Sequence, residues 1–279
     1  MTLATLSDVL QPALRNGYAV AGLVTLGWED MRAYVTAAEA EEVPVILQAG
    51  PSCREHTPLP ILGKTFRHLA ERASVPVVAH LDHGYSYDDC AEALDCGFTS
   101  LMFDGSRLSL EENIAQTTAI AKLAHGAGVS CEGEVGFVGY SGGEASAGTD
   151  PHEAARFATE TGVDAMAISV GNVHLQTEQA GGVDEERVRA IEASSTVPLV
   201  IHGGSGVPSE QRTHLARGSN ICKFNIGTEL RMAFGHALRA SLAKNTDEFD
   251  RIAILKGTHD PLVAATRAVL RHLKSAEQC

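Results

Sequence analysis

Three histidines stand at or just beyond the ends of short apolar runs that are far apart in the sequence: His83, His174 and His202. Imidazole nitrogen is a preferred ligand of zinc. A catalytic zinc is typically held by three protein ligands, which leaves a fourth position for water or substrate. If the fold brings these run ends together, the three histidines predict a catalytic Zn²⁺ site.

Acidic residues stand at the ends of the same or neighbouring runs. Asp82 directly precedes the first histidine, Asp104 ends the run at 98–105, and Glu134 lies near the end of the run at 129–136. Two interpretations of Asp82 stay open: a general acid or base beside the metal, or a carboxylate that holds a histidine. Asp104 and Glu134 could bind a second or alternative cation, divalent or monovalent, or only hydrogen-bond to the ligands.

The runs that carry these residues repeat along the sequence and alternate with helical patterns. Short apolar runs flanked by Pro and Gly are typical of strands buried on both faces. Strands are predicted at residues 18–26, 43–50, 75–84, 98–105, 129–136, 163–172, 197–206 and 221–227. Helical periodicity lies between them, as at residues 28–41, 87–94, 110–125, 151–160, 184–193 and 209–216. This alternation predicts a closed (β/α)₈ TIM barrel, with a doubly wound open sheet as the alternative.

We expect residues 1–279 to form a single barrel domain with two additions. The glycine-rich stretch at 137–150 is long for a strand-to-helix link and predicts a mobile active-site loop. Residues 244–279 predict one or two helices that close the barrel or contact another subunit. In a TIM barrel the catalytic side chains lie at the carboxyl ends of the strands, where the three histidines would converge. His80, one step inside its strand, is interpreted as a core residue.

Small and hydroxyl-bearing residues follow the last two predicted strands. They are Gly203, Gly204 and Ser205 after the seventh strand, and Asn225, Gly227 and Thr228 after the eighth. Barrels commonly cradle phosphate with the loops at these two positions. Together the two stretches predict an anion site, although each alone is equally typical of a turn.

The composition excludes several classes of partner. The chain has 22 basic and 35 acidic residues, a formal net charge of −13, which argues against binding to nucleic acid. It has no apolar run long enough for a membrane span and no pattern of a secretion signal, so a cytoplasmic location is expected. The six cysteines are scattered without a Cys-x-x-Cys pair, and we expect them to be reduced and structural.

These residues resemble the class II, metal-dependent ketose-bisphosphate aldolases, the family of fructose- and tagatose-bisphosphate aldolases. The matching blocks are residues 16–20, 80–83, 104–106, 132–136, 142–144, 171–174, 202–206 and 225–230. They span nearly the whole chain in the family's order. The resemblance implies a reversible cleavage of a ketose phosphate or related keto-sugar into dihydroxyacetone phosphate, or a similar small ketone, and an aldehyde through a metal-stabilised enediolate.

The resemblance also implies roles for individual residues. The metal set would be one Zn²⁺ on His83, His174 and His202, with Asp104 and Glu134 beside it. Asp82 would handle the proton of the hydroxyl where the carbon bond breaks, and Glu144 would exchange the proton at the donor carbon. Homodimers or homotetramers are typical of the family.

The chain departs from the family pattern around its phosphate site. Family members usually have Gly directly after the sixth-strand histidine and a Lys nearby, whereas this chain has Leu175 and the acidic Glu178. An early asparagine is replaced by Val24, and Gly50 stands where many members carry Ser. These departures predict a different acceptor, a sugar acid, or a ketose without two phosphates.

Three alternatives remain open from the sequence. A Schiff-base aldolase would need a reactive strand lysine, and Lys223 is interpreted as structural instead. A barrel metallohydrolase typically has His-x-His on its first strand and Asp after its last, whereas this chain has Asn225 there. A non-catalytic aldolase-like binding protein would be expected to lose ligands that this chain keeps.

Overall fold

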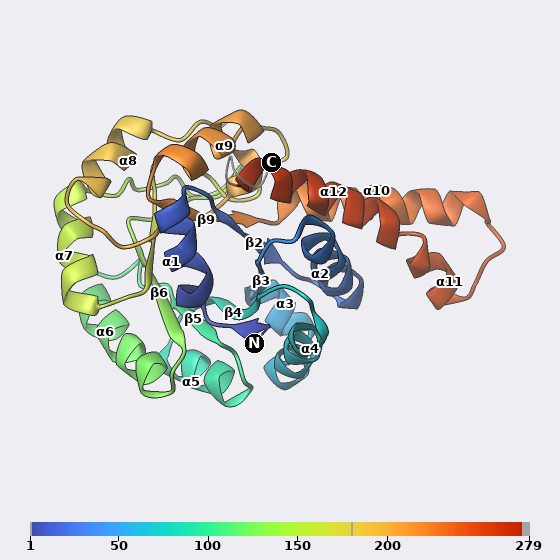
Figure 1. Ribbon diagram of the computed structural model, residues 1–279, viewed down its shortest axis with the longest axis horizontal. Helices are drawn as coiled ribbons and strands as arrows, with labels where there is room; N and C mark the ends of the chain where they lie inside the picture. The colour runs from blue at the N-terminus through green and yellow to red at the C-terminus, as the bar shows by residue number, and fades with distance from the viewer. Residues whose placement is uncertain (1, 180, 275–279) are drawn as a thin grey trace.

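The computed structural model describes residues 2–179 and 181–274. Eight parallel strands form the core: β2 (Val20–Val24), β3 (Val45–Ala49), β4 (Val77–Gly84), β5 (Ser100–Phe103), β6 (Ser130–Val135), β7 (Ala165–Ile168), β8 (Leu199–Ile201) and β9 (Ile221–Ile226). Each strand pairs with the next, and β9 pairs with β2, so that the sheet closes on itself (Figure 1). The predicted (β/α)₈ TIM barrel is confirmed, and the open sheet is wrong.

Helices surround the barrel on its outside (Figure 1). They are α2 (Trp28–Glu41), α3 (Pro51–His56), α4 (Leu59–Arg72), α5 (Tyr87–Asp95), α6 (Leu110–Gly126), α7 (Pro151–Thr161), α8 (Glu185–Glu192), α9 (Ser209–Gly218) and α10 (Thr228–Lys244). Local sequence fixes several of their starts. Ser109 and Glu112 form a reciprocal capping box at α6, and Asp150 caps α7 immediately before Pro151.

The amino-terminal opening of the barrel is covered by β1 (Leu3–Ala4) and α1 (Leu6–Asn16), as Figure 1 shows. Ser7 at the start of α1 bonds to Asp164 and Ser130, which precede or begin neighbouring strands. Beneath α1 the barrel interior is apolar. This lower layer consists of Val20, Ile46, Val78, Ala165, Ala167, Val200 and Cys222, packed on residues of α1. The opposite, carboxyl-terminal opening is left for side chains that do chemistry.

A helical arm extends from the barrel beyond β9 (Figure 1). It consists of α10, α11 (Arg251–Lys256) and α12 (His259–Leu273). The helix α12 returns alongside α10 and packs on α2. Two described helices, α11 and α12, follow residue 244, and the arm already begins at Thr228 with α10. Residues 275–279 of the predicted extension, including Cys279, lie outside the described residues. None of the described helices is long and apolar enough to cross a membrane.

Candidate active site

The three histidines meet at the carboxyl-terminal opening of the barrel. His83 belongs to β4, His174 follows β7 and His202 directly follows β8. The ring centroid of His83 lies 4.8 Å from that of His202 and 5.5 Å from that of His174, and the latter two lie 5.6 Å apart. One nitrogen from each ring lies within 4.8 Å of the others. This spacing suits three ligands of one cation.

Three carboxylates surround the same cluster. Asp104 Oδ2 lies 2.7 Å from His83 Nδ1, and Glu134 Oε2 lies 4.0 Å from that nitrogen. On the other side of the ring, Asp82 Oδ1 lies 3.9 Å from His83 Nε2. His83, Asp104 and Glu134 form a second group with the spacing of metal ligands. The structure therefore brings together every residue predicted to hold a metal, together with Asp82.

Burial and neighbouring charge act in opposite directions in this cluster. Burial lowers the pKa of His83, but Asp82, Asp104 and Glu134 outweigh it and raise that pKa to about 9. Burial and the charge of Asp104 raise the pKa of Glu134 to about 8. At His174, burial and the two other imidazoles lower the pKa to about 3. A divalent cation would satisfy all of these groups because it attracts both carboxylates and neutral imidazoles.

Unpartnered atoms provide an independent test of whether the site fits a metal. His202 Nδ1, Asp82 Oδ1 and Glu134 Oε2 are buried and have no hydrogen-bond partner. A buried polar atom without a partner normally costs about 1–3 kcal/mol. The two carboxylate oxygens each lie within 4.0 Å of a His83 nitrogen, and unpartnered atoms beside the histidine cluster indicate that the residues fit a bound cation.

The floor of the site is a buried polar network. Lys223 Nζ lies 2.6 Å from Glu132 Oε2 and 3.3 Å from His80 Nε2, and His80 Nδ1 lies 2.8 Å from Ser100 Oγ. Lys223, Glu132 and His80 have no exposed surface. His80 is thus a core residue, as predicted. Lys223 has no access to a substrate, so it cannot form a Schiff base.

A pocket of about 300 Å³ opens above the histidines. Its lining includes the predicted phosphate residues Gly203, Ser205, Asn225, Gly227 and Thr228. Gly204 does not line it and is buried. The Ser205 hydroxyl accepts hydrogen bonds from the backbone amides of Gly227 and Glu229, at 3.2 and 3.4 Å. Ser205 therefore ties the two loops together at the start of α10.

The loop at 137–150 crosses one side of the pocket. Its Tyr140 ring stacks on His174 with a centroid distance of 4.9 Å, and the His174 backbone amide donates to the Gly139 carbonyl at 2.8 Å. Glu144 is exposed and forms an ion pair with Arg107, at 2.7 Å between Oε2 and Nη2. Of the two residues predicted to move protons, Asp82 lines the pocket and Glu144 does not.

Comparison with known proteins gives the site its chemical context. The family model described as "Fructose-bisphosphate aldolase class-II" matches residues 4–278. The chain belongs to the class II fructose-bisphosphate aldolase family. It is therefore an aldolase, a carbon–carbon lyase, and the metallohydrolase and non-catalytic alternatives are set aside. Metal dependence is a property of the class.

Relatives of this aldolase carry more than one substrate name. The fructose-bisphosphate aldolase of Streptococcus pyogenes serotype M3 is 37% identical over 246 residues, which cover 86% of this chain and 83% of that protein. The 6-phospho-5-dehydro-2-deoxy-D-gluconate aldolase of Shouchella clausii is 35% identical, covering 92% and 89%. Among solved structures, the YdjI aldolase from Escherichia coli K12 superposes with a TM-score of 0.83 at 28% identity, over 98% of both chains.

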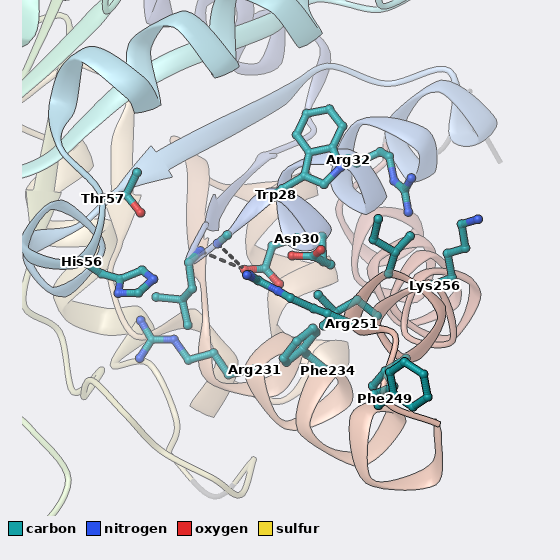
Figure 2. Close-up of a pocket in the computed structure, with 16 residues that line it drawn as sticks. Trp28, Asp30, Arg32, His56, Thr57, Arg231, Phe234, Phe249, Arg251 and Lys256 are labelled. Carbon is teal, nitrogen blue, oxygen red and sulfur yellow. Dashed lines mark hydrogen bonds between the residues drawn. The ribbon is translucent and has the colours of Figure 1, made fainter. Parts of the chain in front are cut away.

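This aldolase also has a larger cavity, of about 1010 Å³, between the barrel and its helical arm (Figure 2). Arg231, near the start of α10, lines both this cavity and the pocket above the histidines. Three more cations line the cavity, namely Arg32, Arg251 and Lys256. Within the described chain none of these four is in an ion pair. Asp30 faces the cavity too, but its carboxylate accepts from the backbone amides of Leu26 and Gly27 (Figure 2).

Sequence reasoning missed Tyr85, Tyr140 and Arg231, which line the pocket. Tyr85 directly follows the end of β4, and Arg231 directly follows the block at 225–230, so both lie next to recognised signals. Tyr140 carried no such signal, because its place depends on how the long loop folds back on His174.

Proposed function

We propose that this aldolase cleaves a phosphorylated ketose or a related keto-sugar acid into dihydroxyacetone phosphate, or a similar small ketone, and an aldehyde. The proposal includes one Zn²⁺ held by His83, His174 and His202. The observation that carries it is the convergence of three imidazole nitrogens within 4.8 Å at the barrel mouth, beside a buried carboxylate. A bound cation would polarise the ketone oxygen and stabilise the negative charge that develops on bond cleavage.

Asp82 is suited to accept the proton of the carbinol hydroxyl. Its carboxylate is buried in the pocket wall, and one of its oxygens has no hydrogen-bond partner. The charges of His83 and His202 lower its pKa despite burial, so that the group is ionised and can accept a proton. We assign Asp104 and Glu134 one of two roles: they orient His83, or they bind a second cation transiently.

The donor-carbon proton is assigned to Glu144, which requires the loop at 137–150 to close. Glu144 and Arg107 are both more than half exposed, at 56% and 61% of their side chains. An exposed ion pair of this kind is worth at most about 1 kcal/mol, so it opposes closure only weakly. Tyr140, already in the pocket, is the second candidate for this proton transfer.

The substrate's phosphate is assigned to the loops after β8 and β9. Gly203, Ser205, Asn225, Gly227 and Thr228 line the pocket at the amino terminus of α10, where backbone amides and the helix dipole favour an anion.

The other end of the substrate is assigned to the large cavity beyond Arg231. Its unpaired cations suit a second anionic group, either a phosphate or a sugar carboxylate. The relatives named for fructose bisphosphate and for a phosphorylated dehydrogluconate both support this class of substrate.

The decisive experiment is a screen of zinc-loaded protein for aldehyde release from ketose phosphates, ketose bisphosphates and phosphorylated keto-sugar acids. A chelator-treated sample should lose activity and regain it with Zn²⁺. His174→Ala should be inactive, and His68→Asn, a change at an exposed histidine outside the site, should match wild type. Chelated protein that stays fully active would overturn the proposal.

We further propose a cytoplasmic homodimer or homotetramer in which residues 1–279 act as one domain. The helical arm supports assembly because it carries exposed apolar side chains, including Leu242 at 45%, Phe249 at 92% and Ile252 at 64% exposure. Sedimentation of wild type and Phe249→Ser tests this directly. If wild type and Phe249→Ser had the same mass at every concentration, the subunit interface would not involve Phe249 of the arm.

A further inference from the structure

The imidazole of His202 is held from below by one carboxylate. Its Nε2 lies 3.1 Å from Glu132 Oε1, and neither side chain has any exposed surface. The other ring nitrogen, Nδ1, has no hydrogen-bond partner and faces the metal cluster, 3.7 Å from Glu134 Oε2. The two nitrogens of this ring therefore have different surroundings.

This asymmetry decides which nitrogen carries the proton of the neutral ring. An ionised carboxylate can only accept a hydrogen bond, so Nε2 must be the donor to Glu132. The lone pair then lies on Nδ1, where a cation would be bound. Without Glu132 the ring would be free to take the other tautomer, with its proton pointing at the cation.

Lys223 holds Glu132 in its turn. Its Nζ lies 2.6 Å from Glu132 Oε2, the oxygen that His202 does not use. The two carboxylate oxygens are thus fixed by groups on different sides. Lys223 and Glu132 stand on β9 and β6, and His202 follows β8, so rigid strands set all three positions.

Packing requirements alone do not explain a charged layer here. The barrel layer just below is apolar, built from residues such as Ile46, Val78 and Val200. A buried ion pair is often no more stabilising than apolar residues of similar volume. The charged pair instead contacts the histidine cluster, through Glu132 and His202.

We propose that Glu132 and Lys223 are positioning residues of the metal centre: Glu132 fixes the ring and tautomer of His202, and Lys223 fixes Glu132. The inference rests on the proposed function, because it assumes that His202 binds the cation. It adds two residues that never touch substrate.

The test is metal binding by purified Glu132→Gln, measured by competition with a chromogenic chelator. Partners of this kind typically contribute about 10–100-fold in metal affinity, so the Zn²⁺ dissociation constant should rise by about that factor. The visible absorption of the Co²⁺-loaded variant should shift as well, because the His202 donor has changed. Wild-type affinity together with an unchanged Co²⁺ spectrum would overturn the inference.

The double variant Glu132→Met/Lys223→Met separates positioning from folding. It removes both buried charges, so it should fold at least as well as Glu132→Gln while it binds Zn²⁺ just as weakly. A folded double variant with wild-type metal affinity would show that the pair is only structural. Glu41→Gln, which breaks the ion pairs of a buried carboxylate remote from the site, should leave metal affinity unchanged.

Wild-type protein separates this inference from the proposed function. If wild type binds no Zn²⁺ in this assay, both fail. If it binds one ion per chain and Glu132→Gln binds equally well, only the positioning role fails.

Discussion

Asp82 and His83 are adjacent in β4, yet both side chains lie in the same pocket, with Asp82 Oδ1 3.9 Å from His83 Nε2. Neighbours in a regular strand point to opposite faces. Here His83 has a φ of 55°, in the left-handed region, and the pairing with β5 shifts register between Leu81 and Gly84. The irregularity turns the end of the strand so that a candidate ligand and a candidate base share one site.

Asp82→Asn should abolish carbon-bond cleavage but leave the metal in place. The amide keeps the size of the side chain but cannot accept the carbinol proton, a loss of about 10²–10⁴-fold in kcat. The three histidines are untouched, so zinc content should stay near one per chain. The kcat for cleavage and the zinc content per chain are measured on the same preparation of the variant.

A different result would select the other interpretation of Asp82. If the variant lost zinc and recovered the wild-type rate when Zn²⁺ was added in excess, Asp82 would serve only to hold the histidines. Asp88→Asn, an exposed change on α5, is the matched control.

Glu144→Gln should slow hydrogen exchange at the donor carbon at least tenfold while changing KM little. The loop must release Glu144 from Arg107 before it can act, so Arg107→Ala should leave exchange as fast as in wild type or faster. Exchange is followed by NMR of the ketone product in D₂O.

The same assay on Tyr140→Phe identifies the competing group. Tyr140 already contacts His174 by stacking. Slow exchange in Tyr140→Phe, combined with normal exchange in Glu144→Gln, would transfer the role to the phenol.

The barrel and its three histidines could be predicted from sequence because both depend on local patterns. An apolar run in the sequence predicts each buried strand. Closure of the barrel then brings the carboxyl ends of the strands together, and with them His174 and His202. The ion pairs Lys223–Glu132 and Arg107–Glu144 could not be predicted, since each joins residues far apart whose contact depends on strand register or loop path. The left-handed backbone at His83 could not be predicted either, because the residue at that position is not a glycine.

Leu175, next to His174, also has a left-handed backbone, with a φ of 60°. That conformation costs a residue with a Cβ roughly 1–2 kcal/mol, which Gly avoids, although Gly adds up to about 1 kcal/mol of unfolded-state entropy. Leu175→Gly should therefore raise stability by up to about 1 kcal/mol in urea unfolding.

Leu175 is 49% exposed and lines the pocket, so burial against protein offsets the strain only in part. We expect Leu175→Ala, which keeps the strain and removes the side chain, to raise KM as much as Leu175→Gly does. If both variants keep the wild-type KM, the side chain does not contact substrate.

Glu41 joins α2 to α12 and gives the fold a defined pH dependence. Its Oε1 lies 2.7 Å from Arg267 Nε and 2.9 Å from Arg271 Nη2, and its Oε2 lies 3.0 Å from Lys274 Nζ. Burial alone would raise the pKa of Glu41, but these cations lower it to about 2 from 4.5. A lowered pKa in the folded state stabilises the fold above the unfolded pKa, and this stabilisation is lost as pH falls.

Glu41→Gln should therefore cost about 1–2 kcal/mol at pH 7, a moderate value because the two arginines are partly exposed. The difference in Tm between wild type and variant should narrow as pH falls from about 4.5 towards about 2. Thermal unfolding followed by circular dichroism at pH 7, 4 and 3 measures it. Protonation of Glu41 in wild type removes the charge that the variant lacks, so the two proteins become alike at low pH. A Tm difference that stays constant down to pH 3 would show that the three cations do not stabilise the ionised form of Glu41.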